Sequence, residues 1–408
     1  MRKWKGAWVV VAIAGASLGT VSEVAGVPVA HADGPGVGAP WVVSLGDSYI
    51  SGEAGRWAGN SNNSSASVDA GGAGAYFDNA TATAEQINRC HRSTAAEIHI
   101  GGGVNSLNLA CSGAKTGTYT TSEGYFKPGI DFAASGANKG QALMLQEFAA
   151  THNVQMIQLS IGGNNFKFAD IVQACVTNFL TSPSWWPNYC YDDNSVKNNF
   201  TSSNITTQTN AIIAAIGNIR TAMANAGYTT AQYTIVVQTY PSPIPRGSGF
   251  RYSQSGFTRQ STGGCGFWNK DADWANDTAL VKINDSVKAA ANAANAVSGN
   301  VRIMDVAAAF NGRRLCETGV NLMEHTGKGA WTAAGASDVT EWVAQIRTLS
   351  TVFGPYYVQE SIHPNWWGEK ALRNCVRQAY NGGTPRGGTC TRGPNGLNPQ
   401  GEPNMTFT

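Results

Sequence analysis

Short apolar runs alternate along the chain with stretches of helical periodicity. Five such runs end at small or polar residues, which is typical of buried strands that stop at turns. These predicted strands are residues 41–45, 107–110, 154–161, 233–237 and 301–306. Helical patterns are found at residues 141–150, 166–176, 208–226, 275–296 and 366–379. The alternation predicts one five-stranded parallel sheet with helices on both faces, a three-layer α/β/α sandwich.

The turns that follow these strands are the first place to look for chemistry. Ligands of a parallel α/β sheet bind at the carboxyl ends of its strands. Gly46, Asp47 and Ser48 follow the first predicted strand, and residues 162–165 (Gly-Gly-Asn-Asn) follow the third. Residues 59–74 and 241–266 do not fit the alternation and are predicted as long surface loops. We see no linker that would separate two domains.

The chain is predicted to have a leader, one domain and a tail. Residues 1–32 resemble a secretory signal peptide: a basic start, an apolar stretch at residues 7–16, and Ala30-His31-Ala32 as the cleavage site. A membrane anchor is the alternative, but the stretch is shorter than the ~20 residues that a bilayer needs. We therefore expect an extracellular protein with a single domain at residues 33–390. The Gly/Pro-rich tail, residues 391–408, is expected to pack poorly.

Composition narrows the possible partners. Only 13% of the 408 residues are charged, and 28 Lys and Arg stand against 26 Asp and Glu without clusters of either sign. A nucleic-acid binder normally carries a basic excess, so we expect no nucleic-acid partner. Hydrophobic residues make up 42% of the chain, which excludes a disordered protein. We expect a monomer with no transmembrane segment.

Export also changes the interpretation of the cysteines. An even number of cysteines in an oxidising compartment predicts disulfides. The sequence has no C-x-x-C motif, so nothing indicates a zinc site or a redox site. Sequence alone leaves the pairing open, although the spacing favours neighbours. The favoured pairs are Cys90 with Cys111, Cys175 with Cys190, Cys265 with Cys316, and Cys375 with Cys390.

Ser48 and His363 are the candidate catalytic residues. A serine at a strand-to-helix turn can be an exposed nucleophile whose own N–H helps to stabilise an oxyanion. The alternative for Ser48 is a helix N-cap. His363 stands in Glu360-Ser361-Ile362-His363, which supplies an imidazole and a possible orienting group. The alternative for His363 is that it stands near the start of a helix and has no catalytic role.

Five short motifs in a fixed order resemble the SGNH (GDSL) hydrolase superfamily, in particular its secreted actinobacterial lipases, esterases and phospholipases. They are residues 46–52, 90–93, 110–114, 161–164 and 363–365. The resemblance implies a flavodoxin-like fold with Ser48 as nucleophile and His363 as base. It also implies an oxyanion hole formed by the N–H groups of Ser48 and Gly113 and the side-chain amide of Asn164.

The chain departs from the family pattern at two positions. Many members have Asp three residues before the histidine, where this chain has Glu360; some use only a backbone carbonyl, which here is that of Ser361. We leave both as candidate orienting groups. The common Gly-Asn-Asp is Gly163-Asn164-Asn165, which keeps the amide and loses the neighbouring charge. The loss is expected to change the packing of the loop.

Three functions remain in competition. The leading hypothesis is a secreted hydrolase of lipid or other carboxylic esters. A carbohydrate esterase that deacetylates a polysaccharide is the second, suggested by the neutral charge and by two tryptophan pairs. Trp185-Trp186 is a candidate exposed platform for a sugar or an acyl chain. Trp366-Trp367 is expected to pack in the interior, and one of its rings is also a candidate wall of the acyl site. An inactive secreted binding protein is the third. No motif for a metal or a nucleotide is present, so we expect no cofactor.

Overall fold

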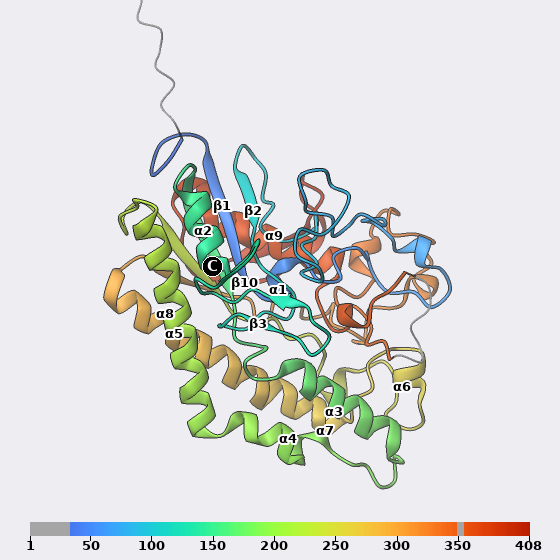
Figure 1. Ribbon diagram of the computed structural model, residues 1–408. Coiled ribbons are helices and arrows are strands. Elements are labelled where there is room, and N and C mark those ends of the chain that lie inside the picture. The colour runs from blue at the N-terminus through green and yellow to red at the C-terminus, as the bar shows by residue number, and fades with distance from the viewer. Residues whose placement is uncertain (1–32, 349–354) are drawn as a thin grey trace, which may run out of the picture. The chain divides into compact units, whose positions relative to one another are not determined.

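The computed structural model describes residues 33–348 and 355–408 (Figure 1). The predicted signal peptide, residues 1–32, therefore lies outside the described residues. Within the described ranges, no helix is both long and apolar enough to span a bilayer.

A seven-stranded sheet lies at the centre, in the order β11-β10-β9-β8-β7-β1-β2. The pairs from β2 to β10 are parallel, and β11 runs antiparallel to β10. Its strands are β1 (Pro40–Gly46), β2 (Asn105–Asn108), β7 (Asn153–Ser160), β8 (Thr234–Gln238), β9 (Val301–Asp305), β10 (Gly388–Leu397) and β11 (Pro403–Phe407). Two small hairpins join β3 (Tyr119–Thr120) to β4 (Phe126–Lys127) and β5 (Ala134–Ser135) to β6 (Asn138–Lys139).

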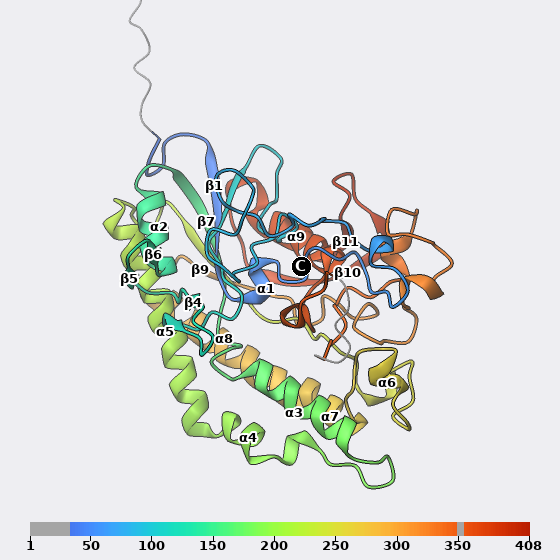
Figure 2. The same cartoon turned by 45° about the vertical axis from the view of Figure 1, so that its right-hand side comes forward.

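Helices lie on both sides of this sheet. Figure 2 shows α2 and α5 on one side of β1 and β7, and α9 on the other. The helices are α1 (Ser48–Ser51), α2 (Gln141–Ala149), α3 (Phe168–Thr181), α4 (Asn194–Lys197), α5 (Ser202–Asn225), α6 (Thr258–Ser261), α7 (Asn269–Trp274), α8 (Leu280–Ser298) and α9 (Trp366–Tyr380). In α5, Ile212, Ile216 and Ile219 recur at helical spacing and are buried. The mixed α/β class with a mainly parallel sheet is confirmed.

The predicted number of strands and the predicted tail are both wrong. All five predicted strands are present as β2, β1, β7, β8 and β9, but two further strands extend the sheet beyond β9. These strands come from the segment expected to pack poorly. Met405 and Phe407 of β11 are buried, and Cys390 of β10 is bonded to Cys375 of α9. The tail is therefore part of the folded domain.

Candidate active site

Ser48 lies where β1 ends and α1 begins (Figure 1). Gly46 has φ +143°, and a Cβ there would come within 2.0 Å of the Ser160 carbonyl oxygen on β7, so only glycine fits. The Asp47 carboxylate accepts a hydrogen bond from the Tyr49 N–H and caps the helix. Ser48 is thereby the first helical residue, and its N–H has no partner within the helix.

His363 faces Ser48 from the other end of the chain. Its Nε2 atom lies 2.6 Å from Ser48 Oγ, and its Nδ1 atom lies 2.9 Å from the Ser361 carbonyl oxygen. Because a carbonyl only accepts, Nδ1 carries the proton and Nε2 is left to accept from the serine hydroxyl. Burial lowers the pKa of His363 below its ordinary value of 6.5, which favours the neutral ring at neutral pH.

The turn that carries His363 is held in an uncommon backbone conformation. Ile362 has φ +63°, in the left-handed region that branched residues rarely adopt. Its N–H donates to the Ala344 carbonyl, and its own carbonyl accepts from the Tyr49 hydroxyl at 2.9 Å. Ala344 N–H in turn donates to the His363 carbonyl. These bonds hold the base on the segment of residues 341–346 and on α1.

The Glu360 carboxylate forms no hydrogen bond with the His363 ring, although the Glu360 backbone carbonyl accepts from the His363 N–H. Its carboxylate accepts from Trp57 Nε1 at 2.8 Å, from the Tyr76 hydroxyl at 2.6 Å and from the Tyr357 N–H at 3.0 Å. Burial raises the pKa of Glu360 to about 7. Of the two orienting groups that the sequence left open, the structure puts the Ser361 carbonyl at the imidazole and turns Glu360 toward the neighbouring loop.

The predicted oxyanion-hole residues lie on the turns after β2 and β7. Gly113 has φ +80°, and Asn164 lines the same pocket as Ser48, with its amide also donating to the Ala114 carbonyl at 3.0 Å. The Tyr240 hydroxyl links the β7 turn to the serine turn, because it accepts from the Gly163 N–H and donates to Asp47. The described residues provide no hydrogen-bond partner for the Gly113 N–H.

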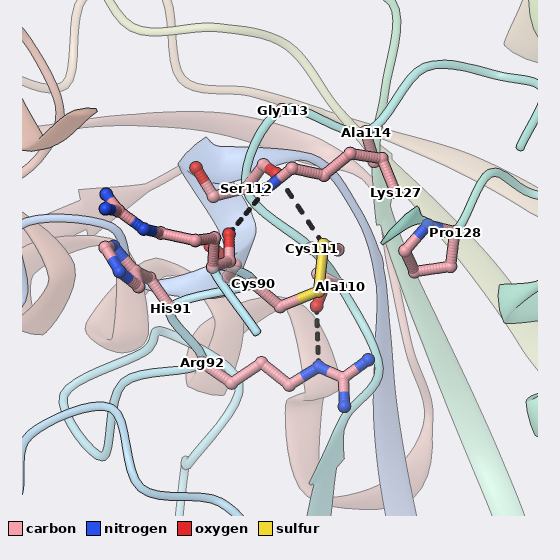
Figure 3. The surroundings of a disulfide bond; sticks show 12 residues. Cys90, His91, Arg92, Ala110, Cys111, Ser112, Gly113, Ala114, Lys127 and Pro128 are labelled. Atoms are coloured by element: carbon pink, nitrogen blue, oxygen red, sulfur yellow. Dashed lines mark hydrogen bonds between the residues drawn. A yellow bond between two sulfur atoms is a disulfide. The ribbon is translucent and has the colours of Figure 1, made fainter. Parts of the chain in front are cut away.

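A disulfide and a basic side chain support the Gly113 loop (Figure 3). The Cys90–Cys111 bond joins it to the second motif, and the Ser112 N–H donates to the Cys90 carbonyl. Arg92 donates to the Ala110 carbonyl at 2.7 Å. Asn165 also holds this loop, since its side-chain amide oxygen accepts from the Thr116 N–H.

All eight cysteines form disulfides, and they pair as the neighbours that the spacing favours. Among the described residues, Cys175, Cys190 and Asp271 are the one group of side chains spaced as metal ligands. Both of its sulfur atoms are bonded to each other, so no thiolate is left to bind a metal.

Sequence analysis missed a buried charged cluster beside the site. Glu53 lies on the turn after α1 and hydrogen-bonds to His91 Nδ1 at 2.8 Å. Burial alone would raise the pKa of Glu53, but the charge of His91 lowers it to about 2. Gln359 donates to Glu53 and to the Ser112 hydroxyl, which connects the base turn with the Gly113 loop. His91 stands in the motif at residues 90–93 without a role that the sequence predicts, and no local pattern marks Glu53 or Gln359.

An apolar pocket begins at Ser48 and extends between α3 and α8. Its walls include Ser48, Asn164 and Ile362, together with side chains of both helices and of the segment before α8. Its apolar members include Phe168, Ile171, Val172, Ile244, Phe267, Ala279, Leu280 and Ile283. Neither Trp366 nor Trp367 lines this pocket, so neither ring forms the candidate wall of the acyl site, and Trp367 is buried as expected. Trp185 and Trp186 are exposed on the loop after α3.

Comparison with known proteins gives structural neighbours only. No family model and no curated protein matches the chain. The fold is similar to an extracellular lipase from Streptomyces rimosus, with 20% identity, TM-score 0.43, and coverage of 84% of this chain and 100% of that one. A phospholipase A1 from Streptomyces albidoflavus NA297 has 16% identity, TM-score 0.41, and coverage of 84% and 99%.

A family two carbohydrate esterase from Clostridium thermocellum is a third neighbour, with 11% identity and TM-score 0.36. The match covers 84% of this chain and 63% of that chain. Because every one of these TM-scores is below 0.5, we draw no functional conclusion from the similarities.

Proposed function

We propose that the chain is an extracellular serine hydrolase of SGNH type that cleaves carboxylic esters. The observation that carries this proposal is the contact of 2.6 Å between Ser48 Oγ and His363 Nε2, beside a mostly apolar pocket that Ser48 lines. A serine with a positioned, neutral imidazole is the arrangement that activates a hydroxyl for acyl transfer. Four disulfides agree with an oxidising compartment.

The proposed reaction has two halves. Ser48 Oγ bonds to the ester carbonyl carbon while His363 Nε2 takes the hydroxyl proton, and the carbonyl oxygen becomes an oxyanion. His363 then gives this proton to the departing alkoxide as the C–O bond breaks, which leaves an acyl-serine. Water attacks the acyl carbon, its proton passes to His363 and returns to Ser48 Oγ, and the acid is released.

Hydrogen-bond donors near Ser48 suit the developing oxyanion. The N–H groups of Ser48 and Gly113 and the amide of Asn164 are proposed to donate to it. The Ser48 N–H stands at a helix start, where partial positive charge favours an anion. The Ser361 carbonyl is proposed to hold the ring of His363 in the tautomer that accepts from Ser48.

The apolar pocket supports an acyl chain longer than acetyl as the preferred substrate group. Side chains of α3 and α8 offer an acetyl group no polar partner and offer a longer alkyl chain extensive apolar contact. We therefore place lipid-like esters before acetylated polysaccharides. Rates on a series of p-nitrophenyl esters from acetate to palmitate test this order, and a maximum at acetate would favour the carbohydrate esterase.

Ser48→Ala tests the proposed function. The variant is expected to lose turnover of p-nitrophenyl butyrate and labelling by a fluorophosphonate while keeping its unfolding temperature. Ser242→Ala is the matched control, because Ser242 lines the same pocket with its hydroxyl bonded to Ile244 and Asn276. Labelling of Ser48→Ala would contradict the proposal, and a wild-type chain that is not labelled would favour an inactive binding protein.

A further inference from the structure

Trp185 and Trp186 are the most exposed large apolar side chains among the described residues. Their exposed fractions are 80% and 74%. They stand in residues 182–189, Ser-Pro-Ser-Trp-Trp-Pro-Asn-Tyr, a segment without a single charged residue. Two adjacent tryptophans in water expose far more apolar surface than scattered single residues do, so they mark an interaction site.

The backbone holds these rings away from the domain. The Asn188 N–H donates to Ser182 Oγ at 2.9 Å and closes the base of the loop, and the Trp186 N–H donates to the Pro183 carbonyl at 2.9 Å. The Cys175–Cys190 disulfide ties both ends of the loop to α3. A partner therefore meets a loop that is already ordered, which reduces the entropy lost on binding.

The same helix connects this loop with the pocket at Ser48. Phe168, Ile171 and Val172 in the first turns of α3 line the pocket. The helix runs about 14 Å from Val172 to its end at Thr181, and the tryptophan loop follows directly. Leu180 in the last turn is also partly exposed. A partner bound by the loop therefore lies next to α3, the helix whose first turns form a wall of the pocket.

We propose that the 182–189 loop anchors the enzyme to an uncharged lipid–water interface. This inference rests on the proposed function, since esters with long acyl chains aggregate and present their own interface. Tryptophan suits such a boundary because its ring is apolar and its N–H remains polar. A loop without charge makes the attraction independent of anionic lipid. A sugar platform would use one face of a ring, whereas both rings here are exposed over most of their surface.

Vesicle sedimentation with the Ser48→Ala protein tests the inference without hydrolysis. The probe is large unilamellar vesicles of phosphatidylcholine, in low salt and in 0.5 M NaCl (roughly a 4 Å Debye length). Replacing both Trp185 and Trp186 by Ser is expected to lower the partition coefficient about 100-fold, because burial of each ring contributes about tenfold. Salt is expected to have no effect, and Phe at both positions is expected to restore most of the binding.

Val297→Ser is the matched control. Val297 is 72% exposed in the last turn of α8, and the C-terminal end of that helix lies away from the segment after α3 in both views (Figures 1 and 2), so its replacement is expected to leave the partition coefficient unchanged. Equal binding by the double serine variant, or no binding by the parent, would overturn the inference. So would binding of xylohexaose that disappears with the two tryptophans. A wild-type protein that does not hydrolyse soluble p-nitrophenyl butyrate would instead overturn the proposed function.

Discussion

The proposed base is oriented by a neutral group. His363 donates to the Ser361 carbonyl, while the buried carboxylates of Glu53 and Glu360 bind His91 and the Trp57–Tyr76 pair. An imidazolium formed during the proposed reaction is therefore stabilised by the charge of Glu53 without a direct hydrogen bond, and not by a hydrogen-bonded carboxylate. Two consequences of this arrangement are measurable.

The first is the pH dependence of activity. Burial lowers the pKa of His363, and the charge of Glu53 opposes this effect while that of His91 adds to it. Since the reaction needs the neutral ring, kcat/KM is expected to rise with pH through an apparent pKa below 6.5 and to be constant at neutral pH. Initial rates on p-nitrophenyl butyrate between pH 4 and 8 (about ±2 units around the ordinary value) measure it. A fall in kcat/KM at acid pH with an apparent pKa above 6.5 would contradict the assignment of His363 as the titrating group.

The second concerns Glu360. An amide at this position keeps an oxygen for Trp57 and Tyr357 and offers an N–H to the Tyr76 hydroxyl, so Glu360→Gln is expected to lower kcat less than about tenfold. If Glu360 oriented the base, the same substitution would cost about 10⁴-fold, as amide replacement does in catalytic triads. His363→Ala serves as the inactive reference in the same kcat measurement.

Asn164 and Asn165 are adjacent, yet the structure predicts different effects for their loss. Asn164→Ala is expected to lower kcat about 10²- to 10³-fold with KM nearly unchanged, because the amide, which also donates to the Ala114 carbonyl, is proposed to donate to the oxyanion, a charge that exists only during the reaction. Asn165 bonds to Thr116 and Gln208. Its replacement by Ala is expected to lower the unfolding temperature and to reduce kcat much less. Equal kcat losses would argue against the oxyanion role.

At the level of secondary structure, the five parallel strands β1, β2, β7, β8 and β9 could be predicted, and the C-terminal pair β10 and β11 could not. Strands such as β7 are buried along nearly their whole length, so they appear in the sequence as continuous apolar runs. β10 has the sequence GTCTRGPNGL with mostly exposed or half-buried residues, and its pairing depends on β9, β11 and the disulfide to α9. Such long-range partners leave no local signal.

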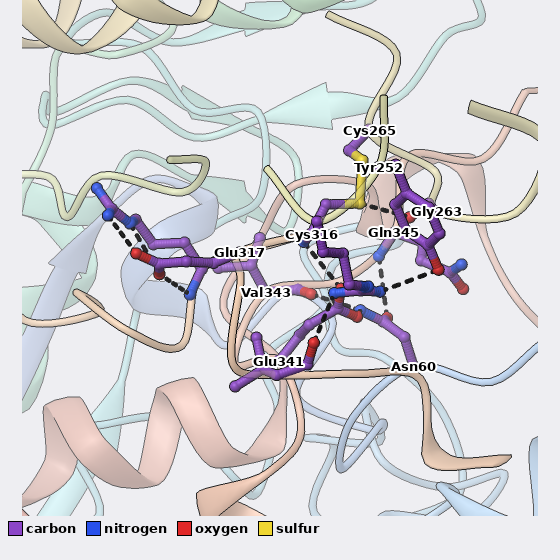
Figure 4. Close-up of polar contacts among 12 residues, drawn as sticks. Asn60, Tyr252, Gly263, Cys265, Cys316, Glu317, Glu341, Val343 and Gln345 are labelled. Atoms are coloured by element: carbon purple, nitrogen blue, oxygen red, sulfur yellow. Dashed lines mark hydrogen bonds and ion pairs between the residues drawn. A yellow bond between two sulfur atoms is a disulfide. The ribbon is translucent and has the colours of Figure 1, made fainter. Parts of the chain in front are cut away.

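The segment of residues 341–346 is the element that holds the histidine turn, and Glu341 fixes it (Figure 4). The fully buried Glu341 carboxylate accepts from Arg251 at 2.6 Å, from the Cys316 N–H at 2.8 Å and from the Asn60 amide. The Cys265–Cys316 disulfide joins the same cluster. The position of His363, the proposed base, therefore depends on the buried ion pair of Glu341 and Arg251.

Glu341→Gln is expected to lower the free energy of unfolding by about 3–5 kcal/mol, because the largely buried Arg251 loses its counter-ion. Urea denaturation followed by circular dichroism measures the loss. Glu147→Gln is the control: Glu147 pairs with Lys139 on the surface, and its replacement is expected to cost less than about 1 kcal/mol. Similar losses in the two variants would show that Glu341 does not anchor the segment.

At the scale of the whole molecule, the proximity of Ser48 and His363 could be predicted and their surroundings could not. The two residues are 315 positions apart, but each belongs to one of the five short motifs. Ser48 follows the first predicted strand, at the edge of the sheet where ligands bind, and His363 stands just before the predicted helix at residues 366–379. Glu53 and Gln359 have no motif. Their roles arise from loops that meet only in the folded chain, so burial and contact distance reveal them.

The core of the molecule also contains two carboxyl groups that the proposed reaction does not use. Glu97 and Glu369 are both fully buried, and the Glu97 N–H donates to Glu369 at 3.1 Å. Gln158 of β7 and Gln238 of β8 donate to the Glu97 carboxyl. Burial raises the pKa of both acids above the ordinary value of 4.5, despite the nearby charge of Arg373.

These raised pKa values make the fold sensitive to alkaline pH. The native state binds more protons than the unfolded chain once the pH exceeds 4.5, so the contribution of the pair to stability falls as the pH rises. Glu97→Gln removes one of these acids. The unfolding free energy of the wild type is expected to fall between pH 5 and pH 9 (roughly either side of the raised pKa). The fall is expected to be smaller in the variant, by about 1.4 kcal/mol or more. Asp285→Asn, at an exposed position of α8, is expected to follow the wild type. Parallel pH curves for Glu97→Gln and wild type in urea denaturation would show that Glu97 is ionised in the folded chain throughout.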